Sequence, residues 1–333
     1  MRRPAPGRAS AAFTLAGIVL GAVLLAFFFH HSPVPWSEML ETLRPLKPWG
    51  LVLVFATTAL HCLLTAWKWR FVTRLTAVGA DLGLGYYHYT ALIALFAQVL
   101  PVQIAVMAGR SIALRIHHRV PVRRAAAGAL HDQAFDILVP LVVLPPALLY
   151  FLGKIGGAGA ALTSLALLIA GGIAFAALGG AMLPRAARAL SVLARLLPPA
   201  GGGGGSFARL YEPRALAAIY ALSAARFLNL VLRAWLVAWS VGLDIGLDVM
   251  LYCYALVTCA LVLGFVPGAL GVIEWGWVAT LSAFGADAPA AFQYAIASRL
   301  IVVAALVALN LTNALAVPIY RGLCAWIRRR SDS

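Results

Sequence analysis

Long apolar runs, separated by short polar segments, extend along most of the chain. Runs of about twenty residues are long enough to cross a bilayer as a helix. The pattern therefore predicts an all-α polytopic membrane protein, a single membrane domain over residues 1–333. We place its full spans at residues 11–29, 48–67, 125–151, 160–183, 215–241 and 289–320.

Two further apolar stretches, near residues 86–120 and 248–288, are interrupted by proline and glycine. Backbone groups at membrane depth remain unpaired only where protein covers them or where they line a wet cavity. We therefore expect each stretch to form a broken, re-entrant hairpin and not a full span. The residues that mark the breaks are Pro101, Pro267, Gly268 and Gly271.

The two interrupted stretches are similar to one another. Aligning Pro101 with Pro267 places Ala105-Val106 on Gly271-Val272. Two corresponding broken segments indicate the binding site of a transporter built from repeats. The chain is then divided into a first helix with an outer loop, a first half, a basic and Gly-rich cytoplasmic linker, and a second half, at residues 1–47, 48–183, 184–214 and 215–333.

Composition and charge narrow the class of protein. With 63% hydrophobic and 11% charged residues, the chain is not a soluble globular protein, in which about a quarter of the residues are charged. The formal net charge is +15, but the basic residues cluster between apolar runs, which is the positive-inside pattern. No RNA-binding signature accompanies them, so we expect no nucleic-acid partner.

The basic segments also predict the orientation of the chain. Both termini would lie in the cytoplasm, and the bias toward Ala, Gly and Arg indicates a bacterial source. Basic residues flank the first hairpin, whereas Asp248 and Asp287 flank the second. The hairpins should therefore open to opposite sides, and the two halves would be inverted repeats.

Two other groups of residues have simpler interpretations. Lys68, Arg70 and Arg74 mark a basic loop after the second span, and the segment Trp67-Lys68-Trp69-Arg70 acts as an interface anchor. The four cysteines are scattered, without a CxxC pair or a histidine at metal spacing. We expect no metal and no cofactor, and the sequence leaves the oligomeric state open.

Charged and polar residues within the spans are the candidates for substrate binding. A charge that faces lipid costs a few kcal/mol, so these side chains should face one another or a hydrated cavity. They are either ion pairs that hold helices together or a groove whose arginines bind an anionic head group, because guanidinium matches phosphate oxygens; for the set we favour the groove. Arg110 can also be assigned to the basic loop that follows it. The candidates are Arg110, Asp132, Asp136, Arg226, Asn229, Arg233, Glu274 and Arg299.

Three segments carry a resemblance to a known family: QVLPVQIAVMAGRSIALR, ALHDQAFDIL and FVPGALGVIEWGWVATLSAFG. Over roughly residues 40–320 the chain resembles the flippase-like family named for the transmembrane region of lysylphosphatidylglycerol synthetase. The positions that match its motifs are Pro101, Arg110, Asp132, Pro267, Gly271, Val272 and Glu274. The chain departs from them at Ala105-Val106-Met107, where Gly-Gly-Asp is common, at Gln133 and Ile273, where Arg is usual or frequent, and at the inserted Trp275.

The resemblance implies an inner-membrane protein that moves an anionic lipid or a lipid-linked sugar. We expect no lysyl transfer, because that chemistry belongs to a separate soluble domain. In this hypothesis Arg226, Arg233 and Arg299 hold a phosphate, while Glu274 and Asp132 bind a coupling proton or pair with those arginines.

Two alternatives remain. A membrane enzyme with Asp132 or Glu274 as general base would need a nucleophile or metal cluster that the sequence does not offer. A non-transporting accessory subunit of a lipid- or glycan-synthesis complex would explain the departures from the family motifs. The expected partners are accordingly a membrane lipid or polyprenyl-linked substrate and, in the accessory case, enzymes of lipid or glycan synthesis.

Overall fold

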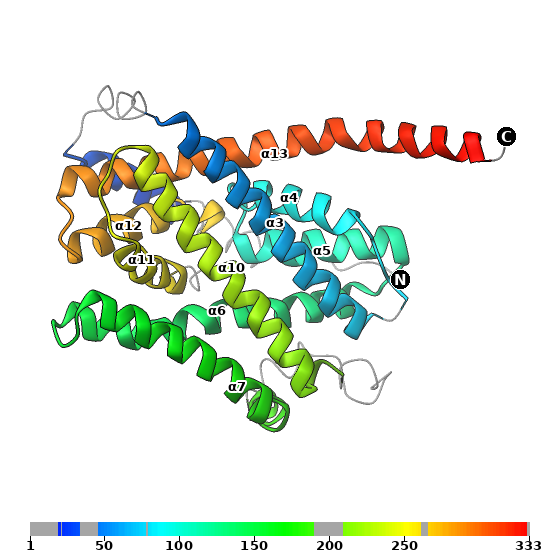
Figure 1. Ribbon diagram of the computed structural model, residues 1–333, viewed down its shortest axis with the longest axis horizontal. Coiled ribbons are helices and arrows are strands. Elements are labelled where there is room, and N and C mark those ends of the chain that lie inside the picture. Colours follow the sequence, from blue (N-terminus) through cyan, green and yellow to red (C-terminus); the bar gives the residue numbers. More distant parts are fainter. Residues whose placement is uncertain are drawn as a thin grey trace.

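The computed structural model describes residues 19–20, 22–33, 46–77, 79–189, 209–260 and 266–331, and within these residues every regular element is a helix (Figure 1). This confirms the all-α prediction. The residues of the first predicted span that are described, 19–20 and 22–29, are helical. The elements that follow are α3 (Pro48–Thr76), α4 (Gly85–Phe96), α5 (Val102–His118), α6 (Val122–Phe151), α7 (Gly157–Ala189), η1 (Arg209–Tyr211), α10 (Pro213–Ser240), α11 (Leu247–Ala260), η3 (Pro267–Ala269), α12 (Val272–Ala283) and α13 (Ala288–Ser331).

Five helices in the described part of the chain are long and apolar enough to cross a membrane. They correspond to the predicted spans at 48–67, 125–151, 160–183, 215–241 and 289–320. The end of the second span was wrongly placed, because α3 continues to Thr76. Trp69 and Lys68 are therefore buried within the bundle, at 3% and 0% exposure, and are not parts of a surface loop.

The two interrupted stretches form helix pairs that are too short to cross the membrane. Helices α4 and α12 have 12 residues each, α11 has 14 and α5 has 17, whereas a full span needs about twenty. Between α4 and α5 the chain turns at residues 97–101, and Pro101 directly precedes α5. The second break contains η3, which begins at Pro267, and ends at Gly271 directly before α12.

The two hairpins enter the bundle from opposite ends (Figure 1). The Lys47 amide, at the start of α3, donates a hydrogen bond to the carbonyl of Ser240 at the end of α10 (3.1 Å). Helices α3 and α10 are therefore antiparallel. Since α4 follows the end of α3 and α11 follows the end of α10, their hairpins open at opposite ends. This is the arrangement that inverted repeats require.

The breaks of the two hairpins touch one another. The amide of Gly268 donates to the carbonyl of Leu100 (3.0 Å), so the tip of one hairpin is bonded to the tip of the other. Gly268 has a φ of 58°, and a Cβ there would collide with the carbonyl oxygen of Gln98. Only glycine satisfies both the backbone conformation and the close approach.

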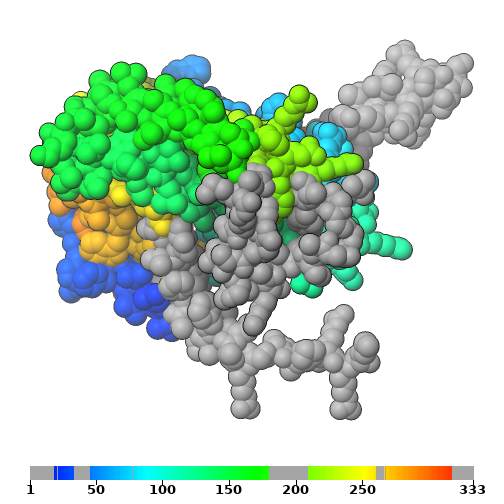
Figure 2. All heavy atoms as spheres, turned by 90° about the horizontal axis from the view of Figure 1, so that it is seen from below, coloured from blue at the N-terminus to red at the C-terminus, as the bar shows by residue number. Residues whose placement is uncertain are grey.

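Helix α10 is the central helix of the fold and contacts α3, α6, α7, α11 and α13. By contrast, α7 lies at the periphery and covers much of the face seen in Figure 2. Large apolar side chains of α7, including Leu162 and Ile173, are more than half exposed. An outer helix of this kind suits contact with lipid. Helix α10 buries one face, including Phe227, Val231 and Ala234, and exposes Leu228 and Leu232 on the other.

Candidate functional site

A cavity of about 320 Å³ lies where the two hairpins meet α3, α6, α10 and α13. Residues from both breaks contribute to its wall, among them Gln98 and Gly268. The charged side chains on the described part of the wall are Arg110, Asp136, Arg226, Arg233 and Arg299. The structure thus brings together five of the eight predicted site residues around one space.

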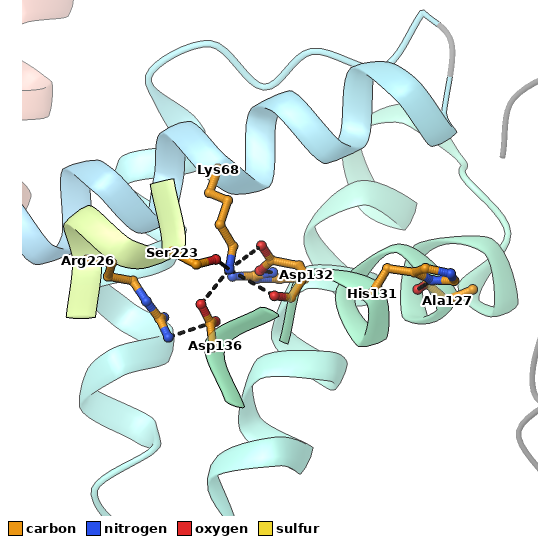
Figure 3. A network of polar contacts seen from close by, with 8 residues as sticks. Lys68, Ala127, His131, Asp132, Asp136, Ser223 and Arg226 are labelled. Atoms are coloured by element: carbon orange, nitrogen blue, oxygen red, sulfur yellow. Dashed lines mark hydrogen bonds and ion pairs between the residues drawn. The ribbon is translucent and has the colours of Figure 1, made fainter. Parts of the chain in front are cut away.

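Lys68 is the centre of a buried ion cluster beside this cavity (Figure 3). Its Nζ lies 2.9 Å from Oδ1 of Asp132 and 2.5 Å from Oδ1 of Asp136. The ammonium also donates to the backbone carbonyl of Asp132 (2.8 Å) and to Oγ of Ser223 (2.9 Å). Asp132 and Asp136 are four residues apart on α6, which directs both carboxylates toward α3.

Two arginines complete the Lys68 cluster. Arg110 pairs with Oδ2 of Asp132 and lies over the ring of Trp69, with its guanidinium carbon 5.4 Å from the ring centroid. Arg226 pairs with Oδ2 of Asp136 at 2.7 Å. Arg110 is only 3% exposed, so its alternative assignment to the basic loop was wrong. Each aspartate therefore bridges two cations, which is how charges are tolerated at this depth.

A second ion cluster holds the break of the second hairpin. Glu274 Oε1 accepts a hydrogen bond from Nε of Arg299 (2.7 Å) and also lies 2.7 Å from Nη2 of the same guanidinium. The other carboxylate oxygen accepts the amide of Gly271 (2.7 Å), which satisfies a free N–H group at the start of α12. Nη1 of Arg299 donates to the carbonyl of Gly268 (2.9 Å). Arg299 thereby ties α13 to the point where the two hairpins touch.

Arg233 differs from the other charged residues of the site. It lines the cavity, but within the described residues no carboxylate lies within ion-pair distance of its guanidinium. It lies seven residues after Arg226 on α10, or about two helical turns. Asn229, between them, does not line the cavity, because its amide donates to the carbonyl of Thr57 and joins α10 to α3 (2.9 Å).

The site carries more positive than negative charge. Its three carboxylates are Asp132, Asp136 and Glu274, and its five cations are Lys68, Arg110, Arg226, Arg233 and Arg299. Two positive charges are therefore in excess within the bundle. Since charges at membrane depth are costly unless they are paired, the site favours an anion.

Sequence reasoning missed Lys68 and several neutral polar residues of the cavity wall. Lys68 was taken for a surface residue because Arg70 follows it. A signal was present, since His61, Thr65 and Lys68 recur at spacings of four and three along α3. That spacing places them on one helix face. His61 and Thr65 line the cavity, and Lys68 lies one turn further on. The described residues contain no group of three or more His, Cys, Asp or Glu that could hold a metal ion.

Outside the bundle, Asp81 anchors the loop that leads into the first hairpin. It accepts hydrogen bonds from Arg70 (2.7 and 3.1 Å), from Arg74 (3.0 Å) and from the amide of Gly83 (2.9 Å). The Arg70 side chain first, and then the Gly83 amide, hold the pKa of the Asp81 carboxyl well below its ordinary value. Arg70, which is half-buried, and Arg74, which is exposed, are thus the basic residues at the end of α3 that the sequence indicated.

Apolar spans, two opposed broken hairpins and a central charged cavity define a class: a multi-pass α-helical membrane protein with its candidate site inside the bundle. The chain belongs to the family described as lysylphosphatidylglycerol synthase TM region, whose model matches residues 14–309. This confirms the suspected family and relates the protein to lipid handling. A comparison with curated proteins gives no match.

Proposed function

We propose that the protein binds an anionic lipid, either a phospholipid or a polyprenyl-phosphate or glycolipid, in the central cavity and carries it across the membrane. The observation that supports this most directly is the excess of two positive charges in the site. Arg233 lines the cavity and has no carboxylate partner among the described residues. A phosphodiester brings one negative charge and a phosphate monoester up to about two, so the first would neutralise half of the excess and the second nearly all of it.

The geometry of α10 suits a phosphate. Arg226 and Arg233 both line the cavity, and Nε of Arg226 is buried without a protein partner. A guanidinium stays charged at any physiological pH and presents paired N–H donors to phosphate oxygens. The apolar part of the lipid would leave the site past wall residues such as Val106 and Ile137.

The hairpins provide a route to alternating access. They open at opposite ends of the bundle and are joined by the hydrogen bond between Gly268 and Leu100. Arg299 reinforces this junction by binding both Gly268 and Glu274, and its side chain also lines the cavity. A phosphate that drew Arg299 away from Gly268 would loosen the junction. Such a ligand shifts the conformational equilibrium by its preference for one state.

The alternative is a non-transporting accessory subunit in the bacterial inner membrane. It is favoured by the complete pairing of the carboxylates, because ion pairs of this kind also hold helices together without any ligand. The observation against it is Arg233, which has no carboxylate partner among the described residues, since a purely structural network has no need of an uncompensated cation.

Transport is tested with the purified protein in liposomes that contain a fluorescent phosphatidylglycerol. Wild-type protein should move the label between leaflets faster than protein-free vesicles. Arg233→Gln should weaken binding of the lipid by about tenfold to a hundredfold, the usual worth of a charge-assisted hydrogen bond, and slow the transfer. Arg115→Gln, a charge-matched change at an exposed position, should leave it unaltered.

If no anionic lipid moves faster than in protein-free vesicles, transport is refuted. Equal activity of Arg233→Gln and Arg115→Gln would refute the role of the cavity. The accessory alternative makes its own prediction, which is a stable protein partner after extraction in a mild detergent, together with tolerance of Arg233→Gln in cells.

A further inference from the structure

The cavity wall is unsuited to a head group that carries an ammonium. Of the described residues that line it, Asp136 is the one carboxylate, and it is already held by Lys68 and Arg226. Asp132, behind the wall, is shared by Lys68 and Arg110. An incoming ammonium would find no free carboxylate and would be repelled by the arginines.

An aromatic cage for a cation is also not available. Tyr254, Trp277 and Tyr294 line one side of the cavity, and aromatic faces can hold a quaternary or primary ammonium. These rings, however, pack on one another: the centroids of Trp277 and Tyr294 are 4.8 Å apart and those of Tyr254 and Trp277 5.9 Å. Trp277 and Tyr294 are only 4% and 0% exposed, and Arg233 is a near neighbour of Tyr254.

Other helices around the cavity offer neutral polar groups without a protein partner. Four buried side-chain atoms have no hydrogen-bond partner in the protein: Oγ1 of Thr65, Oγ1 of Thr90, Nε2 of Gln133 and Nδ1 of His61. The three residues Thr65, Thr90 and Gln133 are 7%, 5% and 8% exposed, and all four line the cavity. Buried polar side chains almost always have a hydrogen-bond partner. A ligand with several neutral hydroxyl groups would supply these partners.

The neutral groups and Arg233, the arginine without a carboxylate partner among the described residues, come from different helices around the same space. Thr65 and His61 lie one turn apart on α3, Thr90 is on α4 and Gln133 is on α6. Arg233 is on α10, and His61 is close enough to Arg226 and Arg233 to interact with their charges. Because both sets line the same cavity, a head group of one phosphate joined to one polyol has suitable partners for both of its parts there.

Resting on the function proposed above, we propose that the cavity selects a lipid phosphate whose head group is an uncharged polyol, such as glycerol or a sugar, and rejects head groups with an ammonium. Arg233 and Arg226 take the phosphate, and Thr65, Thr90 and Gln133 take the hydroxyl groups. Lysylphosphatidylglycerol, after which the family is named, carries ammonium groups and is a poor ligand for this chain.

The test compares lipids with identical acyl chains by native mass spectrometry of the purified protein. Phosphatidylglycerol and phosphatidylinositol supply a polyol. Phosphatidylmethanol has the same phosphodiester charge without a hydroxyl group, and phosphatidylethanolamine and lysylphosphatidylglycerol supply ammonium groups. The polyol lipids should bind about tenfold more tightly than phosphatidylmethanol, as expected for one or two neutral hydrogen bonds. The ammonium lipids should not displace them.

Variants separate the polyol contacts from the phosphate contact. Gln133→Leu and Thr90→Val should lower the affinity for phosphatidylglycerol to that for phosphatidylmethanol and leave the latter unchanged. Thr90→Ser, which keeps the hydroxyl group, should preserve the preference. Thr312→Val is the control, because this exposed hydroxyl group donates to Leu309 of its own helix.

The outcomes distinguish the two proposals. If no anionic lipid binds, or if binding is indifferent to Arg233→Gln, the proposed function fails. If phosphatidylmethanol binds as tightly as phosphatidylglycerol, while Arg233→Gln still weakens both, only the polyol inference is overturned. Displacement of phosphatidylglycerol by lysylphosphatidylglycerol at equal concentration would also overturn it.

Discussion

Replacement of Lys68 by methionine is the most direct test of the buried ion cluster. The side chain is fully buried, and its ammonium lies within 2.9 Å of both Asp132 and Asp136. Methionine keeps most of the volume but removes the charge and all donors. The variant therefore leaves two carboxylates with fewer cations at membrane depth.

The expected loss of stability follows from what each carboxylate retains. Removing one partner of a buried ion pair costs about 3–5 kcal/mol, because the other charge is left uncompensated. Asp132 keeps Arg110 and Asp136 keeps Arg226, so neither carboxylate becomes isolated. We therefore expect the lower end, about 3 kcal/mol, in the free energy of unfolding.

The assay is thermal unfolding of the detergent-solubilised protein. A loss of about 3 kcal/mol should lower the Tm by roughly 5 °C or more. Lys154→Met is the matched control, since Lys154 lies exposed in the turn between α6 and α7, and its Tm should be unchanged. Adding Asp136→Asn to Lys68→Met should not recover the loss, because Arg226 then loses its carboxylate partner as well. If Lys68→Met and Lys154→Met unfold at the same temperature, the Lys68 ammonium contributes no net stability and the reasoning from the buried ion cluster is refuted.

Three further predictions concern the hairpins. Gly268→Ala should destabilise the fold by about 1–3 kcal/mol and slow lipid transfer, because its Cβ meets the Gln98 carbonyl. In the control Gly276→Ala, the Cβ meets Val257 at an ordinary 3.4 Å. Equal Tm values for the two variants would contradict the contact between the breaks. Because the folded-state pKa of Asp81 is lowered, its anchoring of the first hairpin should persist at every pH above the ordinary carboxyl value of about 4 and disappear as the pH falls through the lower folded value. Asp81→Asn should show the loss of this anchor at pH 7 as faster proteolysis of the loop. A loop that is equally resistant in both forms would count against the anchor. In a cysteine-free background, Arg119→Cys and Asp287→Cys should react with an impermeant thiol reagent from opposite sides of the membrane, the first from the cytoplasm; labelling from the same side would refute the opposed hairpins.

Much of the architecture could be predicted because a membrane restricts the backbone. At membrane depth every N–H and C=O group must be bonded within its own segment or covered by protein. Apolar length therefore predicted α6, α7, α10 and α13, and the proline and glycine positions predicted both breaks. The motif residues Arg110, Asp132 and Glu274 were expected to be functional because isolated charges at this depth are costly, and all three lie in the two ion clusters.

The partners of the charges depended on the tertiary structure, for a physical reason. Whether a side chain meets a carboxylate, a cavity or water depends on the rotation and packing of several helices, which no local pattern encodes. The sequence placed Lys68 at the surface, but the length of α3 and its contact with α6 bury it between Asp132 and Asp136. The same packing turns Asn229 toward α3 and leaves Arg233 facing the cavity without a carboxylate. The sequence alone thus determined the depth of Arg110, Asp132 and Glu274, whereas the depth of Lys68 and the pairing and excess of the charges were decided only when the helices packed.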